Sequence, residues 1–194
     1  MVRRSKILNI IVWNRETAIA EVHNLKAPAA VISISTVGDS FPVFNEPEGI
    51  DILYMAFDDV EENETYYHPI TNAQAKIIRD FVEGIKNVDT LVVHCDAGVS
   101  RSAAVAAAIG KYLYNDDMFI FGRPRFCPNR TVYRKVLTAL FNRELLDAEK
   151  VELKEKEDWN TKIWKHFFLL TDNEEEFLDI GIIPMGEELF GQKC

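Results

Sequence analysis

The sequence contains few cysteines, and their positions argue against several kinds of fold. The 194 residues include three cysteines, Cys95, Cys127 and Cys194. An odd number without a CxxC pair does not match a disulfide framework, and there is no Cys/His cluster with the spacing of a structural zinc site. We therefore expect reduced thiols in a cytoplasmic protein, with no bound metal and no other cofactor.

Long hydrophobic runs are also absent. The apolar stretch ILNIIVW (7–13) is too short to span a bilayer, and Asn14, Arg15 and Glu16 follow it with no small-residue cleavage site. This stretch is better interpreted as a first β-strand. The sequence also lacks a Walker A loop and a dinucleotide-binding fingerprint. We expect no association with a membrane.

The sequence has no excess of basic residues. Its 22 Lys and Arg residues face 31 Asp and Glu residues, which gives a net charge of −9. Residues 1–143 hold 16 basic and 17 acidic residues (net −1), whereas residues 144–194 hold 6 and 14 (net −8). This balance argues against general binding to nucleic acid or anionic membranes, because both surfaces would repel the protein. It leaves room for a locally positive site before residue 144.

Short β-branched segments alternate with amphipathic ones along the first three quarters of the chain. The pattern predicts strands at 7–13, 29–35, 50–57 and 90–95, and helices at 15–27, 71–85, 101–114 and 129–143. This order predicts an α/β fold with a central, mostly parallel sheet flanked by helices. We expect one catalytic domain over residues 1–143 and an acidic, partly aromatic extension over residues 144–194 that packs on that domain.

The segment VVHCDAGVSRS (92–102) lies between a predicted strand and a predicted helix. Sites in such sheets form at the carboxyl ends of the strands. Successive backbone N–H groups there can curl into a nest that binds a tetrahedral anion, with Gly98 supplying the backbone freedom. The predicted phosphate-binding loop consists of Asp96, Ala97, Gly98, Val99, Ser100 and Arg101.

The side chains of this segment are suited to nucleophilic chemistry on a phosphate group. The helix N-terminus and a nearby arginine stabilise a thiolate at Cys95. Arg101 can donate two N–H groups to two phosphate oxygens, and Ser102 can donate a hydrogen bond to the sulfur. A single cysteine at a strand end is usually a buried structural residue. The occurrence of Cys95, Gly98, Arg101 and Ser102 together favours the chemical interpretation.

The motif HCDAGVSRS (94–102) resembles the HCxxGxxR[ST] signature of cysteine-dependent protein tyrosine phosphatases, and its GVSRS part looks most like the dual-specificity branch. The resemblance implies a tyrosine phosphatase-like fold, with Cys95 as the nucleophile and Arg101 as the phosphate-binding residue. It also implies that His94 supports the loop structurally. The similarity covers roughly residues 50–143 and is most specific at 92–102.

The same resemblance implies a general acid, an aspartate some thirty to forty residues before the cysteine. Asp58 and Asp59 lie 37 and 36 residues before Cys95. The family pattern favours Asp59 and leaves Asp58 as the alternative, while both also fit a solvated acidic stretch that runs to Glu64. Asn129, after a proline, is predicted to cap a helix and to brace the phosphate loop.

The resemblance implies metal-independent hydrolysis of phosphate monoesters, with phosphotyrosine in proteins favoured and dual specificity left open. The expected partner is a phosphorylated protein or a small phosphomonoester, with no nucleic acid; the sequence gives no indication of an oligomeric state. Two alternatives stay open: a catalytically weak pseudophosphatase that binds phosphoproteins, and a phosphatase for lipid or inositol phosphates. A carboxylate at Asp96 disfavours the latter because it would repel a polyanion.

Overall fold

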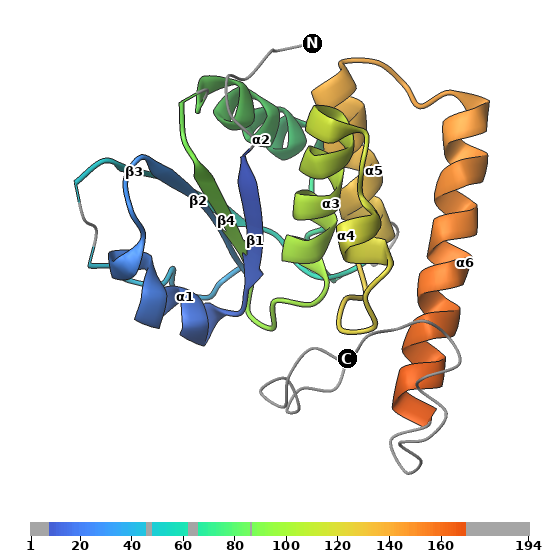
Figure 1. Cartoon of the computed structure of the whole chain (residues 1–194), viewed down its shortest axis with the longest axis horizontal. Coiled ribbons are helices and arrows are strands. Elements are labelled where there is room, and N and C mark those ends of the chain that lie inside the picture. The colour runs from blue at the N-terminus through green and yellow to red at the C-terminus, as the bar shows by residue number, and fades with distance from the viewer. Residues whose placement is uncertain (1–7, 46–47, 62–65, 86, 170–194) are drawn as a thin grey trace.

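A four-stranded parallel sheet forms the centre of the computed structural model, which describes residues 8–45, 48–61, 66–85 and 87–169 (Figure 1). The strands lie in the order β1-β4-β2-β3, and each neighbouring pair is parallel. Their bounds are β1 (Asn9–Trp13), β2 (Ala29–Ser35), β3 (Ile50–Ala56) and β4 (Thr90–His94). The predicted α/β class with a mostly parallel sheet is confirmed.

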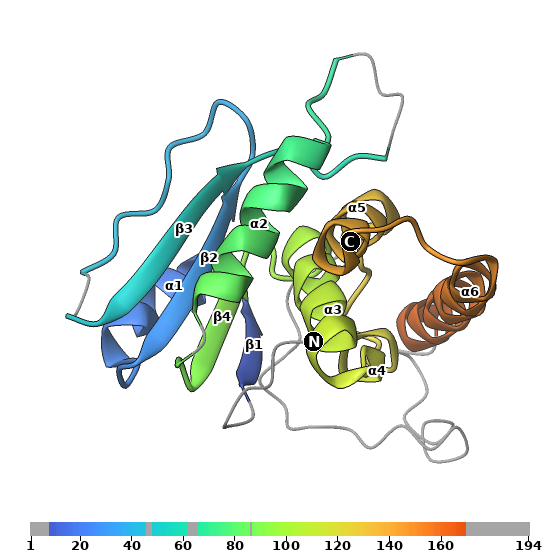
Figure 2. The ribbon, with the colours of Figure 1, turned by 90° about the horizontal axis from the view of Figure 1, so that it is seen from above.

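Helices cover both faces of this sheet (Figure 2). One face packs on α1 (Arg15–Glu21) and the short 3₁₀ turn Val22–Asn24, and the other on α2 (Asn72–Gly84) and α3 (Arg101–Tyr114). Helix α5 (Arg130–Phe141) packs on α2 and α3. Helix α3 follows β4 and is buried from Arg101 to Gly110, because its alanine-rich surface lets both the sheet and α5 approach closely. A short helix, α4 (Met118–Phe121), lies between α3 and α5.

The first helix is shorter than the sequence predicts. We expected a helix over residues 15–27, but the α-helix ends at Glu21 and the chain is extended at Leu25. Pro28 accounts for part of the difference, because a residue that precedes proline is disfavoured in helical geometry. The start of the helix is well defined, since the side chain of Asn14 accepts a hydrogen bond from the N–H of Thr17.

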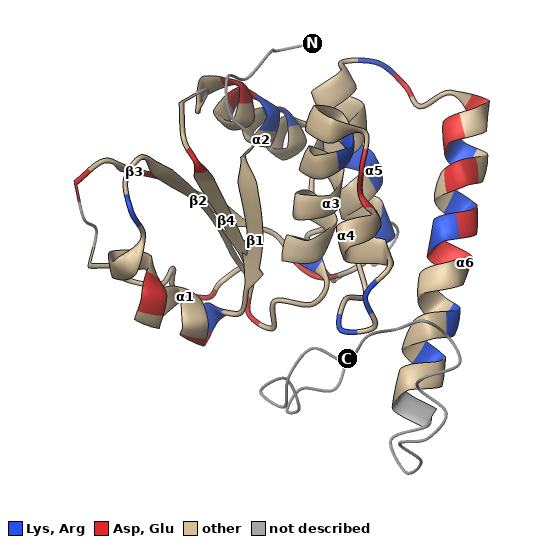
Figure 3. Cartoon of the chain, viewed as in Figure 1, with Lys and Arg blue, Asp and Glu red and all other residues tan. Residues whose placement is uncertain are grey.

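Helix α6 (Asp147–Leu169) lies beyond α4 and α5, away from the sheet (Figure 2). Its acidic and basic residues are interleaved and densest in its N-terminal half (Figure 3). Lys156 contacts the buried carboxylate of Asp117 at 2.7 Å, and Tyr133 donates to the same carboxylate at 2.6 Å. This part of the predicted extension is therefore docked through buried polar contacts, while residues 170–194 lie outside the described residues.

None of the helices in the described ranges is both long and apolar enough to cross a lipid bilayer.

Candidate active site

The register of the sheet brings three strand ends to one edge. Trp13 at the end of β1 and Ser33 near the end of β2 both lie opposite His94, the last residue of β4. Residues that follow these strands therefore share one end of the sheet, as expected for sites in parallel sheets. Arg15, Thr36 and Cys95 come from these three continuations.

The loop between β4 and α3 packs tightly against the end of β1. Gly98 has a φ of +69°, and a Cβ atom there would lie 2.6 Å from the backbone nitrogen of Asn14 and 2.7 Å from the carbonyl oxygen of Trp13. The N–H of Arg15 donates to the carbonyl oxygen of Asp96 at 3.1 Å. Position 98 requires glycine both for its left-handed conformation and for this close approach.

Cys95 lies at the floor of this loop. Its side chain is buried, and its Sγ atom is 3.1 Å from Oγ of Ser102 in the first turn of α3. A hydroxyl at this distance can donate a hydrogen bond to a thiolate. The predicted pairing of sulfur and hydroxyl is thus geometrically available.

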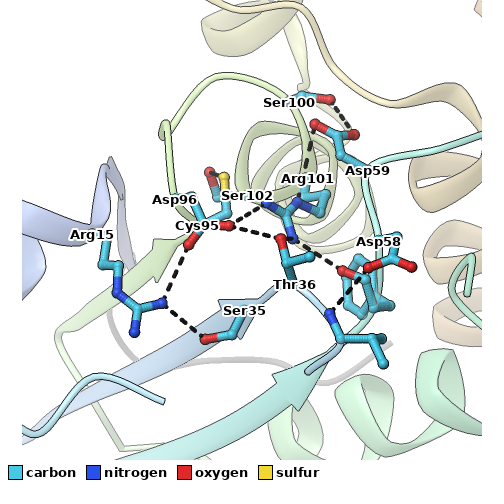
Figure 4. Close-up of polar contacts among 12 residues, drawn as sticks. Arg15, Ser35, Thr36, Asp58, Asp59, Cys95, Asp96, Ser100, Arg101 and Ser102 are labelled. Carbon is cyan, nitrogen blue, oxygen red and sulfur yellow. Dashed lines mark hydrogen bonds and ion pairs between the residues drawn. The ribbon is translucent and has the colours of Figure 1, made fainter. Parts of the chain in front are cut away.

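Arg101 is 5% exposed and its guanidinium reaches three segments (Figure 4). Nη1 donates to Oγ1 of Thr36 at 3.1 Å and to the carbonyl oxygen of Phe57 at 3.0 Å. Nη2 donates to a carboxylate oxygen of Asp96 at 2.6 Å. Nε makes no hydrogen bond within the described part of the chain and lies 4.0 Å from Asp59, so it is a buried donor available to an anion.

The carboxylate of Asp96 lies between two arginines (Figure 4). Besides Arg101 it contacts Nη1 of Arg15 at 3.3 Å, and it accepts a hydrogen bond from Oγ1 of Thr36 at 3.0 Å. Burial alone would raise the pKa of Asp96, but the hydrogen bond and charge of Arg101 lower it below its ordinary value. Asp96 is therefore an ionised group that is held by Arg101 and Arg15.

The two neighbouring aspartates point to different places. Asp59 accepts hydrogen bonds from Oγ of Ser100 at 2.7 Å and from Nδ2 of Asn129 at 2.9 Å, which puts its carboxylate beside the phosphate loop (Figure 4). Asp58 accepts instead from the backbone N–H groups of Val37 at 3.0 Å and His68 at 2.7 Å. Of the two candidates, the geometry favours Asp59 as a group that reaches the site.

Asp58 has a structural role. Its burial would raise its pKa, but the N–H groups of His68 and Val37 outweigh that effect and lower the pKa below its ordinary value. The carboxylate joins the loop after β2 to the chain around His68. Asp58 thus ties together two of the loops that surround the site.

His94 and Asn129 occupy supporting positions. The ring of His94 is buried, and its Nε2 atom lies 2.8 Å from Oγ of Ser33. Burial lowers the pKa of His94 to about 4, so the ring is neutral at pH 7. Asn129 accepts from the N–H of Val132 as the N-cap of α5. Its side chain braces the loop of Asp59, whereas its contact with the phosphate loop is a backbone one, to the carbonyl oxygen of Ser100 at 3.5 Å.

No group of three or more His, Cys, Asp or Glu side chains within the described ranges is arranged to hold a metal ion. The arrangement that does exist suits an anion: a buried arginine, a loop of backbone N–H groups at a helix N-terminus, and a thiol at its floor.

Two known phosphatases are similar to parts of this sequence. The chain is 31% identical over 105 residues to MAP kinase phosphatase with leucine-rich repeats protein 2 of Dictyostelium discoideum, covering 51% of this chain and 14% of that protein. It is 35% identical over 65 residues to putative tyrosine phosphatase 123R of Invertebrate iridescent virus 6, covering 34% and 42%. Part of this chain is a distant homologue of tyrosine and dual-specificity phosphatases. It spans less than half the length of either relative, and no protein-family model matches it.

Solved structures of phosphatase-like proteins have a related arrangement. Human DUSP28 matches with a TM-score of 0.47 and 15% identity, over 69% of this chain and 92% of that chain. Human tyrosine phosphatase-like serine/threonine/tyrosine-interacting protein matches with a TM-score of 0.46 and 18% identity, over 75% and 93%. Scores of this size say nothing about activity.

Sequence reasoning missed two residues of this site, Arg15 and Thr36. Both follow strands that neighbour β4, since Arg15 comes just after β1 and Thr36 just after β2. The signal was available, because the carboxyl ends of parallel strands share one edge.

Proposed function

We propose that this protein hydrolyses phosphate monoesters, phosphotyrosine in proteins above all, through a cysteinyl-phosphate intermediate. The observation that supports this best is the convergence of three groups from three elements. Cys95 lies beside the first turn of α3, Arg101 has an unpaired Nε and binds Asp96 of the loop through Nη2, and Asp59 reaches Ser100 of the loop from the segment after β3. The distant homology to tyrosine and dual-specificity phosphatases supports the same proposal.

The first step forms a sulfur–phosphorus bond and breaks the ester phosphorus–oxygen bond. The thiolate of Cys95 attacks in line, while Arg101 and the backbone N–H groups of the loop hold the non-reacting oxygens. Asp59, in its acid form, gives its proton to the leaving oxygen. The products are the free alcohol or phenol and a phosphorylated Cys95.

The second step restores the enzyme with water. Asp59, now a carboxylate, accepts a proton from the water that attacks phosphorus, and the sulfur–phosphorus bond breaks. The hydroxyl of Ser102, 3.1 Å from the sulfur, stabilises the departing thiolate. Inorganic phosphate leaves, and no metal is required for either step.

The substrate that fits this site best carries one phosphate group. The loop positions between Cys95 and Arg101 contain no lysine that would hold a second phosphate, and Asp96 adds a negative charge at the mouth. Like charges at this range repel by about 1 kcal/mol or more near a protein surface. These features favour phosphotyrosine proteins over lipid and inositol polyphosphates. Cys95 and Cys127 are thiols that form no disulfide, which fits a reducing, cytoplasmic location.

Phosphate release from a panel of substrates tests this proposal. We expect turnover of aryl phosphates and phosphotyrosine peptides, less turnover of phosphoserine peptides, and least of phosphoinositides. Cys95→Ser should abolish all of it, while the control Cys194→Ser should keep full activity. Faster release from phosphoinositides would support the lipid alternative. Binding of a phosphopeptide without turnover would identify a pseudophosphatase instead.

A further inference from the structure

Helix α6 contacts the segment that precedes α5 through the buried side-chain amide of Asn160. Asn160 is 5% exposed and lies where α6 faces α4 and the segment that precedes α5. Its Nδ2 donates to the carbonyl oxygen of Phe121 at 3.0 Å and to that of Phe126 at 3.2 Å. A side-chain amide nitrogen carries two hydrogens, so Asn160 uses both of its donors here.

One peptide group connects Asn160 to the phosphate loop. The carbonyl oxygen of the Phe126–Cys127 peptide accepts the hydrogen bond from Asn160, and the N–H of the same peptide donates to the carbonyl oxygen of Val99 at 3.1 Å. A peptide group is planar, so the bonds on its two sides fix its orientation together. Helix α6 is therefore two hydrogen bonds away from the backbone of the phosphate loop.

The same segment also holds the proposed general acid. Asn129 follows Phe126 by three residues, with Pro128 restricting the backbone between them. Asn129 contacts the carbonyl oxygen of Ser100 through its N–H and the carboxylate of Asp59 through its side chain. A displacement of Phe126 would thus disturb contacts to both sides of the site.

Glu157 secures the far end of this segment. It lies three residues before Asn160 on α6, and its side chain is 6% exposed. Its carboxylate contacts Nη2 of Arg134 at 3.1 Å and Nε of Arg130 at 3.7 Å. Both arginines lie in the first half of α5, directly after Asn129, so α6 holds the segment near both of its ends.

We propose that Asn160 is a positioning residue for the active site: it orients the Phe126–Cys127 peptide and, through Val99, the phosphate loop. This inference rests on the proposed function for its kinetic consequence, but its structural part does not. Helix α6 then has two roles: it covers the outer face of α4 and α5, and it sets the geometry of the phosphate loop.

The test compares two α6 variants that differ in what they touch. Asn160→Leu removes both donors at similar side-chain size. Leu153→Ala is the control, because Leu153 is buried on the same helix but lies beside Tyr133 and Leu137, away from the Phe126 segment. The measurements are the backbone amide resonances of residues 96–101, kcat and KM for an aryl phosphate, and the urea midpoint of unfolding.

We expect Asn160→Leu to shift the amide resonances of Gly98 to Arg101 and to lower kcat/KM about 10- to 100-fold, the range expected when reacting groups are misplaced by a fraction of an ångström to one ångström. Leu153→Ala should lower the urea midpoint as much as Asn160→Leu or more. It should leave those amide resonances unshifted and kcat/KM within about twofold of the wild-type value. Asn160→Gln keeps both donors on a longer side chain and should fall between wild type and Asn160→Leu.

Unchanged loop resonances in Asn160→Leu, or equal changes in Leu153→Ala, would overturn the proposal. If the wild type does not hydrolyse aryl phosphates, the proposed function fails, and the amide resonances alone still decide the role of Asn160. If Asn160→Leu does not fold, Asn160→Gln, which displaces both donors on a longer side chain, is compared with Leu153→Ala instead, and unchanged loop resonances in Asn160→Gln would then overturn the proposal.

Discussion

The phosphate loop and the loop of Asp58 and Asp59 meet at one site but are held by different means. The phosphate loop is fixed by backbone: β4 before it, α3 after it, and the end of β1 against Gly98. The aspartate loop is fixed by side chains, with Asp58 bound to Val37 and His68. The comparison shows that backbone packing holds the first loop, against α3 and the distant end of β1, whereas a carboxylate side chain ties the second loop to distant segments.

The largest effect should come from the aspartate that faces the phosphate loop. Asp59→Asn cannot give a proton to the leaving oxygen, so we expect kcat to fall about 10²- to 10⁴-fold for substrates with a poor leaving group. Substrates with a good leaving group should lose less. The measurement is kcat for a series of aryl phosphates that differ in the pKa of their phenol.

Asp58→Asn is the matched control for that experiment, and it should lower kcat much less than Asp59→Asn while the protein is folded. A larger loss of kcat in Asp58→Asn than in Asp59→Asn would reverse the assignment of the general acid and the comparison between the two side chains.

The next effect concerns stability. Asp58→Asn keeps one acceptor and places an NH₂ group against a backbone N–H of Val37 or His68, so we expect the free energy of unfolding to fall by about 1–3 kcal/mol at pH 7. Because the pKa of Asp58 is lowered below 3.8 in the folded protein, its carboxylate stabilises the fold above about pH 4. That contribution is lost as the pH falls through the folded-state value.

Urea unfolding at pH 7 and pH 3 measures this difference. The difference in free energy of unfolding between wild type and Asp58→Asn should be smaller at pH 3 than at pH 7. Asp51→Asn, an exposed change of the same kind on β3, should alter neither value by more than about 0.5 kcal/mol. A gap that widens on acidification would show that Asp58 does not support the loop as a carboxylate.

The smallest effect should come from Asp96, the charged side chain within the backbone-held loop. Asp96→Asn removes a charge that competes with phosphate for Nη2 of Arg101. Removing a repulsion of about 1 kcal/mol should lower the inhibition constant of inorganic phosphate about three- to tenfold, with kcat within about twofold. Inhibition of aryl phosphate hydrolysis measures it.

Asp39→Asn makes the same change in charge at an exposed position of the loop after β2, and it should leave the inhibition constant unchanged. Equal effects of Asp39→Asn and Asp96→Asn would mean that net charge, rather than contact with Arg101, governs phosphate affinity.

Most of the sheet and its flanking helices could be predicted because their signals are local. The four strands are short apolar runs, and α2, α3 and α5 have apolar residues at helical spacing. Helix α6 was not predicted as one helix, because two of its buried residues, Glu157 and Asn160, are polar and no hydrophobic pattern marks them. Their burial depends on partners that lie in α5 and in the segment before it.

The site divides in the same way. The motif at 94–102 places Cys95 and Arg101 by spacing alone. The choice between Asp58 and Asp59 could not be made from physical chemistry, because adjacent residues of one type differ only in tertiary surroundings. For Arg15 and Thr36 the strand pattern indicates the shared edge, but not that their side chains meet Asp96 across 81 and 60 positions of sequence.

The contact of Gly98 with the end of β1 has a consequence for fragments of this protein. The region that resembles tyrosine phosphatases, residues 50–143, does not include Trp13 and Asn14, whose backbone atoms lie directly against the phosphate loop. It also lacks β1 and β2, the two neighbours of β4 in the sheet. A recombinant piece limited to residues 50–143 would therefore contain every residue of the motif and still lack the surface that shapes it.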